Sequence, residues 1–198
     1  MTDSPERQQD AAGGRRPGKR ERLIAAASRL LHEQGVEKTT LAEIAQSADV
    51  PVGNVYYYFK TKDEIIEAVI DGHASHARAM LASIDGRHRS PKARLKALVG
   101  ELMRQDDVIV AYGCPLGTLC SELDKRAGGP GIAAAELMRI PIAWAEEQFR
   151  SLGRRDAHDL AVSLMATYEG SALLTNTLRD PKILDREARR LDRWIDTL

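Results

Sequence analysis

Two short helical segments separated by a tight break lie within residues 40–58, and this arrangement constrains the fold more than any other feature of the chain. Thr40 precedes the first segment and Glu43 follows three residues later, which is the spacing of a capping box. Pro51 stands just after the break and suits the first turn of the next helix, because its missing N–H would be unpaired there. These features predict a helix-turn-helix whose second helix spans about residues 51–58.

Longer amphipathic helices are expected before and after this pair. The first spans residues 19–34 and ends at Gly35, which adopts positive φ without a steric penalty. Its apolar stripe, at helical spacing, consists of Leu23, Ile24, Ala27, Leu30 and Leu31. The other begins at Lys62, continues to about residue 84 and carries an inner face of Ile65, Ile66, Val69 and Ile70. The core of the whole unit is completed by Leu41, Ile44, Ala45, Ala48, Val50, Val55 and Phe59.

The remainder of the chain also has helical patterning. After a loop at residues 85–91, the expected helices span about residues 91–106, 116–125, 132–152, 157–178 and 185–197. Breaks that contain Gly, Pro or Asp separate most of them. No segment alternates convincingly between apolar and polar residues, and aromatic residues make up only 5% of the chain, which disfavours strands. The chain is therefore predicted to be all-α.

Charge is distributed unevenly, although the formal net charge is zero. Nine basic and five acidic residues lie between residues 15 and 62, and the local excess of positive charge predicts salt-sensitive binding of a polyanion. Much of it belongs to a basic run of Arg15, Arg16, Lys19, Arg20 and Arg22. This run begins inside a polar arm rich in Gly and Pro, residues 1–18, and makes its end basic; we expect this arm to be disordered.

Cysteine content and hydropathy limit the other function classes. Cys114 and Cys120 are the only cysteines and no secretory signal is present, so reduced thiols and a cytoplasmic location are expected. No apolar run reaches the roughly 18 residues that a membrane span needs, so no membrane partner is expected. We find no nucleophile elbow, metal-ligand cluster, phosphate loop or paired catalytic carboxylates, and therefore expect neither an enzyme, nor a cofactor, nor a metal site.

The segment TTLAEIAQSADVPVGNVYYYFKTKDEII, residues 39–66, resembles the signature of the TetR family of bacterial transcriptional regulators. The matching features are Thr40, the LAEIA run, Val50, Gly53, the block Tyr56–Phe59, Lys62 and the pair Ile65–Ile66. The resemblance implies a three-helix helix-turn-helix DNA-binding domain, residues 19–65, and a helical ligand-binding and dimerisation domain, residues 66–198. It implies a repressor that binds a palindromic operator in double-stranded DNA as a homodimer and is released by a small-molecule effector.

The resemblance assigns the DNA contacts to the second helix of the pair and its flanks, namely Thr40, Val52, Gly53, Asn54, Tyr56, Tyr57, Tyr58 and Lys62. Gly53 lets that helix approach base edges, and Asn54 suits adenine. Thr40 is equally explained as a helix cap. One of the three consecutive tyrosines is expected to face inward, because a helix turns about 100° per residue. The basic arm is either a solvated tail or a minor-groove contact.

By the same resemblance, the last two long helices are expected to pair with their copies in a dimer. Their apolar positions are Leu160, Leu164, Tyr168, Ala172, Thr175, Leu191, Trp194, Ile195 and Leu198, with Gly170 and Ser171 allowing close approach. Such spacing by itself indicates intrachain core rather than an interface. The helix that begins at Lys62 belongs to both domains and is the expected mechanical link between them.

A small-molecule cavity would be lined by apolar and aromatic side chains with a few polar groups. The candidates are Tyr112, Cys114, Met138, Trp144, Phe149, Met165, Tyr168, Glu169 and Asn176. Cys114 lies in YGCPLGTLCSEL, which resembles a GC-x-x-G segment in a subgroup of these regulators. At a helix N-terminus its thiolate would be favoured, which suggests an electrophile- or oxidant-sensing regulator as an alternative. A small buried residue in a tight turn is the other explanation.

Overall fold

The computed structural model of the protein describes residues 17–104, 106–125 and 129–198, and these residues form helices and loops without a strand. The all-α prediction is therefore confirmed for the described part of the chain. In chain order the helices are α1 (Lys19–Gln34), α2 (Leu41–Ser47), α3 (Val52–Tyr58), α4 (Lys62–Arg87), α5 (Pro91–Met103), α6 (Asp106–Tyr112), α7 (Pro115–Asp124), α8 (Gly129–Ser151), α9 (Ala157–Leu178) and α10 (Lys182–Thr197).

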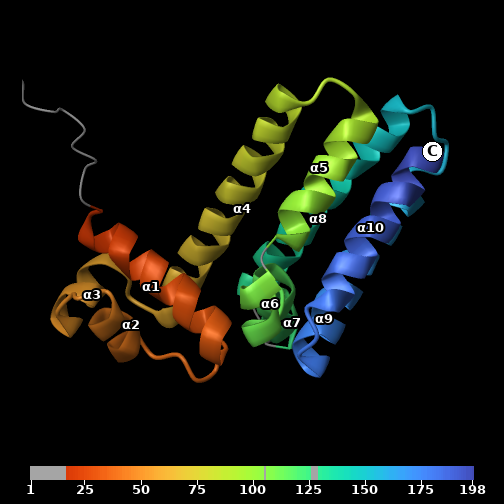
Figure 1. Ribbon diagram of the computed structural model, residues 1–198. Coiled ribbons are helices and arrows are strands. Elements are labelled where there is room, and N and C mark those ends of the chain that lie inside the picture. The colour runs from red at the N-terminus through yellow and green to blue at the C-terminus, as the bar shows by residue number, and fades with distance from the viewer. Residues whose placement is uncertain (1–16, 105, 126–128) are drawn as a thin grey trace, which may run out of the picture.

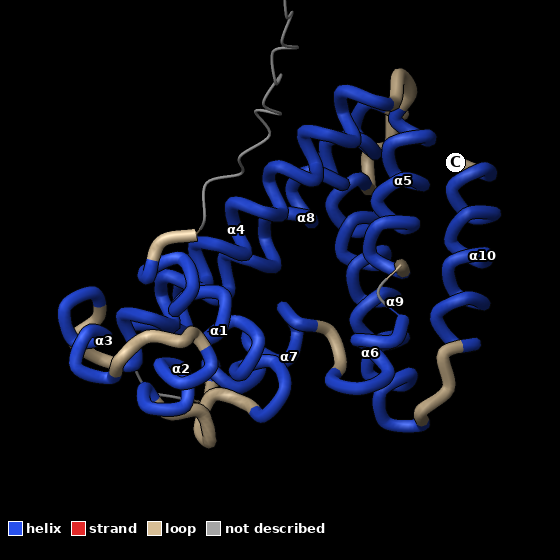
Figure 2. The backbone as a smooth tube through the Cα atoms, turned by 60° about the vertical axis from the view of Figure 1, so that its left-hand side comes forward, coloured by secondary structure: helices blue, strands red, loops and turns tan. Residues whose placement is uncertain are grey.

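The first three helices cluster at one end, and α4 rises from that cluster toward the far end of the molecule (Figure 1). A second view separates the two parts: α1, α2 and α3 lie on one side, α10 lies on the opposite side, and α7 lies beside α1 (Figure 2). No helix among the described residues is long and apolar enough to cross a membrane. Most of the predicted arm, residues 1–16, falls outside the described residues.

Local sequence explains where the first helices begin and end. The backbone N–H of Gly18 donates to Glu21 Oε2 at 2.8 Å at the start of α1, and Gly35 ends that helix with φ of 87°. The capping box before α2 is confirmed: Thr40 Oγ1 accepts from the Glu43 N–H, and Glu43 Oε2 accepts from the Thr40 N–H. Pro51 is the N-cap residue of α3 rather than part of its first turn.

Several boundaries in the second half differ from the sequence-based expectation. α4 continues to Arg87, about one turn beyond residue 84, and the N–H of His88 closes this last turn by donating to the Ile84 carbonyl at 3.0 Å. The helix expected at 91–106 ends at Met103, and a separate short helix, α6, precedes the Gly113 turn. α8 and α10 each begin three residues earlier than expected, at Gly129 and Lys182.

Two apolar clusters form the core. The first joins α1, α2, α3 and the first half of α4 to residues of α7 and α8, namely Leu119, Leu123, Ala134 and Leu137. The second packs α5, α8, α9 and α10 around fully buried side chains such as Leu98, Phe149 and Leu164. The helix-turn-helix end is therefore packed directly against the C-terminal helices.

Candidate nucleic-acid interface and effector cavity

The turn between α2 and α3 fixes the orientation of α3. Asp49 occupies this turn with φ of 51°, a conformation that Asp tolerates better than most residues. The N–H of Val50 then donates to the carbonyl of Ala45 at 3.0 Å. Val50 and Val55 are buried in the first core cluster together with side chains of α1, α2 and α4, so the opposite face of α3 points outward.

That outward face carries the residues predicted to meet DNA. Val52, Tyr56 and Tyr57 are 45%, 51% and 79% exposed, so this short helix presents three apolar or aromatic side chains on its outer face. A Cβ added at Gly53 would meet nothing within 4 Å, so the backbone there is open to an approaching partner. Asn54 is half-buried beside this face.

Tyr58 is the tyrosine that faces inward. It is half-buried and packs against the first core cluster, and its ring meets that of Tyr57 edge to face, with centroids 5.0 Å apart. The prediction that one of the three tyrosines turns inward is therefore confirmed for Tyr58.

Thr40 and Lys62 have internal partners in this structure. The Thr40 hydroxyl serves the capping box and contacts Glu43 Oε2 at 2.8 Å. The Lys62 ammonium donates to the carbonyls of Val36 and Glu37 in the loop that follows α1. Both residues thus stabilise the helix-turn-helix itself. A phosphate contact by either residue would have to form in addition to these internal hydrogen bonds or replace them.

The basic residues at the start of α1 lie against the same unit. The Arg20 guanidinium stacks over the Phe59 ring at 5.3 Å, and Arg22 pairs with Asp49 at 3.4 Å. Arg15 and Arg16, on which the minor-groove prediction mainly depends, lie outside the described residues.

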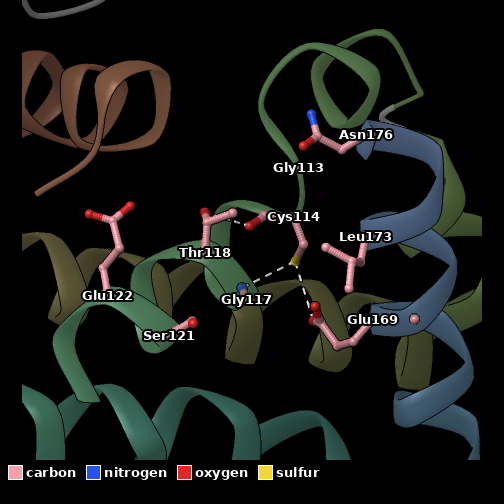
Figure 3. Close-up of a pocket in the computed structure, with 10 residues that line it drawn as sticks. Gly113, Cys114, Gly117, Thr118, Ser121, Glu122, Glu169, Leu173 and Asn176 are labelled. Carbon is pink, nitrogen blue, oxygen red and sulfur yellow. Dashed lines mark hydrogen bonds between the residues drawn. The ribbon is translucent and has the colours of Figure 1, made fainter. Parts of the chain in front are cut away.

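A cavity of about 330 Å³ lies among α4, α5, α7, α8 and α9. Five of the predicted pocket residues line it, namely Cys114, Met138, Met165, Tyr168 and Glu169. Cys114 and Glu169 also line a second cavity of about 450 Å³, which additionally contains Asn176. Figure 3 shows the second cavity, with the Glu169 carboxylate of α9 directed at the Cys114 sulfur.

Three other pocket candidates do not line either of these cavities. The Tyr112 ring packs against the His32 ring, with centroids 5.6 Å apart. Trp144 donates its indole N–H to Asp85 Oδ2 at 3.0 Å. Phe149 is fully buried in the second core cluster. Aromatic character alone suggested a pocket role for these three residues, but their side chains contact other parts of the same chain.

A polar contact links the cavity region to the helix-turn-helix. Glu122 of α7 accepts the N–H of Val36 at 2.6 Å, and the carbonyl of Gly113 lies 3.0 Å from His32 Nε2. Glu122 and Gly113 also line the cavity of Figure 3. The sequence analysis did not find this link, because no local pattern pairs residues 86 positions apart.

Comparison with known proteins agrees with this geometry. Residues 23–69 match the family model described as "Bacterial regulatory proteins, tetR family". The HTH-type transcriptional regulator TtgR of Pseudomonas putida is 27% identical over 188 residues, covering 90% of this chain and 88% of TtgR. An uncharacterised HTH-type transcriptional regulator of Lactococcus lactis is 28% identical over 182 residues, covering 84% of this chain and 87% of that protein. This chain belongs to the TetR family. It is a DNA-binding transcriptional regulator.

The fold of solved TetR-family proteins extends over nearly the whole chain. A TetR transcriptional regulator from Legionella pneumophila superposes with a TM-score of 0.83 at 20% identity, covering 91% of this chain and 98% of the other. The similarity therefore includes the C-terminal helices as well as the helix-turn-helix.

In this TetR-family chain the thiol-sensing alternative is not favoured. Cys114 is buried, and burial together with the neighbouring Glu169 carboxylate raises the pKa of its thiol to about 12. The N–H of Gly117 does donate to the sulfur at 3.3 Å, as expected at a helix N-terminus. Desolvation outweighs that donor, so the thiol stays protonated and acts as a donor to Glu169 Oε1 at 3.3 Å.

The residues predicted for the dimer contact of this regulator also need correction. Leu164, Tyr168, Ala172, Thr175, Leu191 and Ile195 are buried inside a single chain. The apolar side chains of α9 that remain exposed are Val162, Leu173, Leu174 and Leu178. Helical spacing selected the inner face of α9 because both faces of this helix carry apolar residues.

Proposed function

We propose that this TetR-family regulator is a repressor that binds a palindromic operator as a homodimer and is released by a small molecule held in the 330 Å³ cavity. The proposal is carried by the exposed outer face of α3, where two tyrosines and a valine surround the open backbone of Gly53. A recognition helix in the major groove needs such a face, since base edges are read at close range.

We assign the operator contacts to the residues that this face and its flanks carry. Val52, Gly53, Asn54 and Tyr56 lie at the side of α3 that would enter the groove, and Asn54 would read an adenine edge. Tyr57, the most exposed of the set, would reach a phosphate. Thr40, Tyr58 and Lys62 would contact phosphates from the ends of α2, α3 and α4, while retaining their contacts within the chain.

The homodimer is supported by the exposed apolar side chains of α9. Leu173, Leu174 and Leu178 are 65%, 51% and 62% exposed, which exceeds what a monomeric helix needs on its solvent face. Two copies joined there would present two α3 helices to one side of DNA, and a palindromic operator requires these to lie about 34–36 Å apart.

Effector release would act through α4 and α7. α4 contributes Ala77 and Met80 to the cavity and Ile65 and Ile66 to the core below α3. α7 contributes Pro115 and Leu116 to the same cavity, and its Glu122 accepts the N–H of Val36 in the loop after α1. A small molecule that binds better to a different arrangement of these two helices would change the spacing of the α3 pair and weaken operator binding.

A Gly53→Ala substitution tests the DNA-contact surface. The added Cβ meets nothing within the chain, so folding should be unaffected or slightly improved, since Ala is the better helix former. Operator affinity, measured by fluorescence anisotropy, should fall about tenfold or more because the methyl group separates α3 from the base edges. Gly72→Ala is the matched control, because Gly72 is also helical, exposed and open.

Equal operator affinities for the Gly53→Ala and Gly72→Ala proteins would contradict our placement of α3 in the groove. The dimer is tested separately with Leu174→Arg, which should give a monomer by light scattering and lose operator binding together with dimerisation. A Leu174→Arg protein that stays dimeric would exclude this face of α9 as the interface.

A further inference from the structure

Glu169 is a half-buried carboxyl group that has no cationic partner among the described residues. It belongs to α9 and lines both cavities, and its closest polar contact is the Cys114 thiol, which donates to Oε1 at 3.3 Å. The other carboxyl oxygen lies against the first turn of α7, in the space that a Cβ at Gly117 would occupy. Figure 3 shows the Glu169 carboxylate of α9 facing α7, beside the Cys114 sulfur.

The other ionisable groups around the smaller cavity do not supply the missing charge. Glu101 is already paired, with Arg87 at 3.4 Å and with Arg104 at 3.2 Å. Burial lowers the pKa of His73, which favours its neutral imidazole, and this ring contacts Ser28. His76 also lines the cavity, and among the described residues no ion pair joins either histidine to Glu169. The cavity therefore contains one carboxyl group whose negative charge, when present, is not balanced.

The rest of the cavity wall suits an apolar ligand body. Met80, Met138 and Met165 come from three different helices, and Leu102 and Leu116 complete an aliphatic surface. Methionine side chains adapt to different ligand shapes because they are flexible and polarisable. A ligand with an apolar body that enters this space has the Glu169 carboxyl group at its polar end.

An isolated carboxylate in such surroundings is costly unless a positive charge neutralises it. Burial accordingly raises the pKa of Glu169 and disfavours its ionised form. A bound cation would instead favour the ionised form of Glu169, because an opposite charge nearby lowers the pKa of a carboxyl group. The ionised carboxylate would also accept the hydrogen bond that the Cys114 thiol donates.

We propose that the effector is an organic amine with a compact apolar body, whose ammonium group binds Glu169 while the body lies among the three methionines. This inference deepens the proposed function and rests on it, since it names the chemical class that the effector cavity selects. Neutral or anionic molecules of the same shape would leave the carboxyl group unpaired or would be repelled by it.

The test uses three probes that share one body: 4-phenylbutylamine, 4-phenylbutan-1-ol and 4-phenylbutyrate. Calorimetric titration of the full-length protein should show the amine binding at least about tenfold more tightly than the alcohol, with the carboxylate weakest. In the Glu169→Gln protein, which keeps a hydrogen-bond acceptor, the amine and the alcohol should bind within about twofold of each other. Glu147→Gln, on the exposed side of α8, removes the same charge far from the cavity and should keep the preference of the unmodified protein.

Thermal unfolding of each variant confirms that it is folded, and Glu169→Asp provides a second variant that keeps the charge and should keep a preference for the amine. An amine that binds no more tightly than the alcohol, including the absence of binding by all three probes, overturns the proposal. So does an amine preference that survives in Glu169→Gln.

Operator release is measured in a separate titration, so the two proposals fail in different ways. If the alcohol releases operator DNA as well as the amine does, regulation by a small molecule stands and the amine assignment is wrong. If the amine binds through Glu169 without releasing the operator, the assignment of the site stands and effector release through this cavity is wrong.

Discussion

The contact between Glu122 and Val36 provides the most direct test of how the cavity region is joined to the helix-turn-helix. The Glu122 carboxylate accepts the Val36 N–H at 2.6 Å, and Val36 is only 2% exposed. Replacing Glu122 by Ala leaves that N–H buried without an acceptor. An unsatisfied buried donor costs about 1–3 kcal/mol, and the ionised acceptor places this contact toward the upper end.

The strength of this contact can be measured from the hydrogen-exchange rate of the Val36 amide, resolved residue by residue. A loss of about 1–3 kcal/mol corresponds to roughly 5- to 150-fold faster exchange of the Val36 amide, since each factor of ten is about 1.4 kcal/mol. Amides in the middle of α9, which do not touch the contact, should exchange as before. Glu122→Gln keeps a carbonyl acceptor and should give a smaller change.

Glu33→Ala is the control for the loss of a carboxylate near the same place. Glu33 pairs with Arg29 across the exposed surface of α1, and such pairs contribute little. If Val36 exchanges at the same rate in the Glu122→Ala and Glu33→Ala proteins, the link between α7 and the loop after α1 carries no free energy, and our account of coupling through α7 is refuted.

Three further predictions concern stability and reactivity. Gly35→Ala should lower the free energy of unfolding in urea by about 1–3 kcal/mol, because φ of 87° with ψ of 165° is accessible essentially only to glycine; an unchanged midpoint would contradict this conformation. Cys114 should react very slowly with iodoacetamide in the folded protein and rapidly in urea, because its pKa is raised to about 12; fast labelling of the native protein, read by mass spectrometry, would restore the thiol-sensing alternative. Because burial raises the pKa of Glu169, the folded state binds its proton more tightly than the unfolded chain, so the stabilising contribution is present below the ordinary value of 4.5 and is lost as the pH rises through the folded pKa. Thermal melts should therefore show Glu169→Gln gaining stability over the unmodified protein at about pH 8 and losing this advantage near pH 4.5, whereas a gain independent of pH would argue against a shifted Glu169.

Residues 19–70 could be predicted closely because their signals are local. Thr40 and Glu43 satisfy each other within one turn, and Gly35 ends α1 for a reason that belongs to its own backbone. Helical spacing placed α9 within the same bounds as the structure, Ala157–Leu178, for the same reason. In these cases the interactions that decide the structure join residues three or four positions apart.

The rest depends on contacts between distant residues, which spacing does not encode. Tyr112 was expected in the cavity, but His32, eighty positions earlier, provides its packing partner. Lys62 is predicted to contact a DNA phosphate, and the sequence gives no sign that its ammonium also donates to the loop carbonyls of Val36 and Glu37. The short helix α6 was missed because its seven residues are too few for a periodic pattern to stand out from the preceding helix.

The first apolar cluster joins the helix-turn-helix to α7 and α8, and this affects the construction of chimaeric regulators that combine parts of different proteins. Leu119 and Leu123 of α7 and Leu137 of α8 are buried in one cluster with side chains of α1, α2, α3 and α4. A chimaera that grafts residues 19–65 onto an unrelated sensor part would leave these apolar surfaces facing side chains that were never shaped to meet them. A chimaera with a new operator specificity would therefore need to include the buried α7 and α8 residues of this cluster with the transplanted segment. Otherwise both sides of the interface between the two parts would have to be redesigned together.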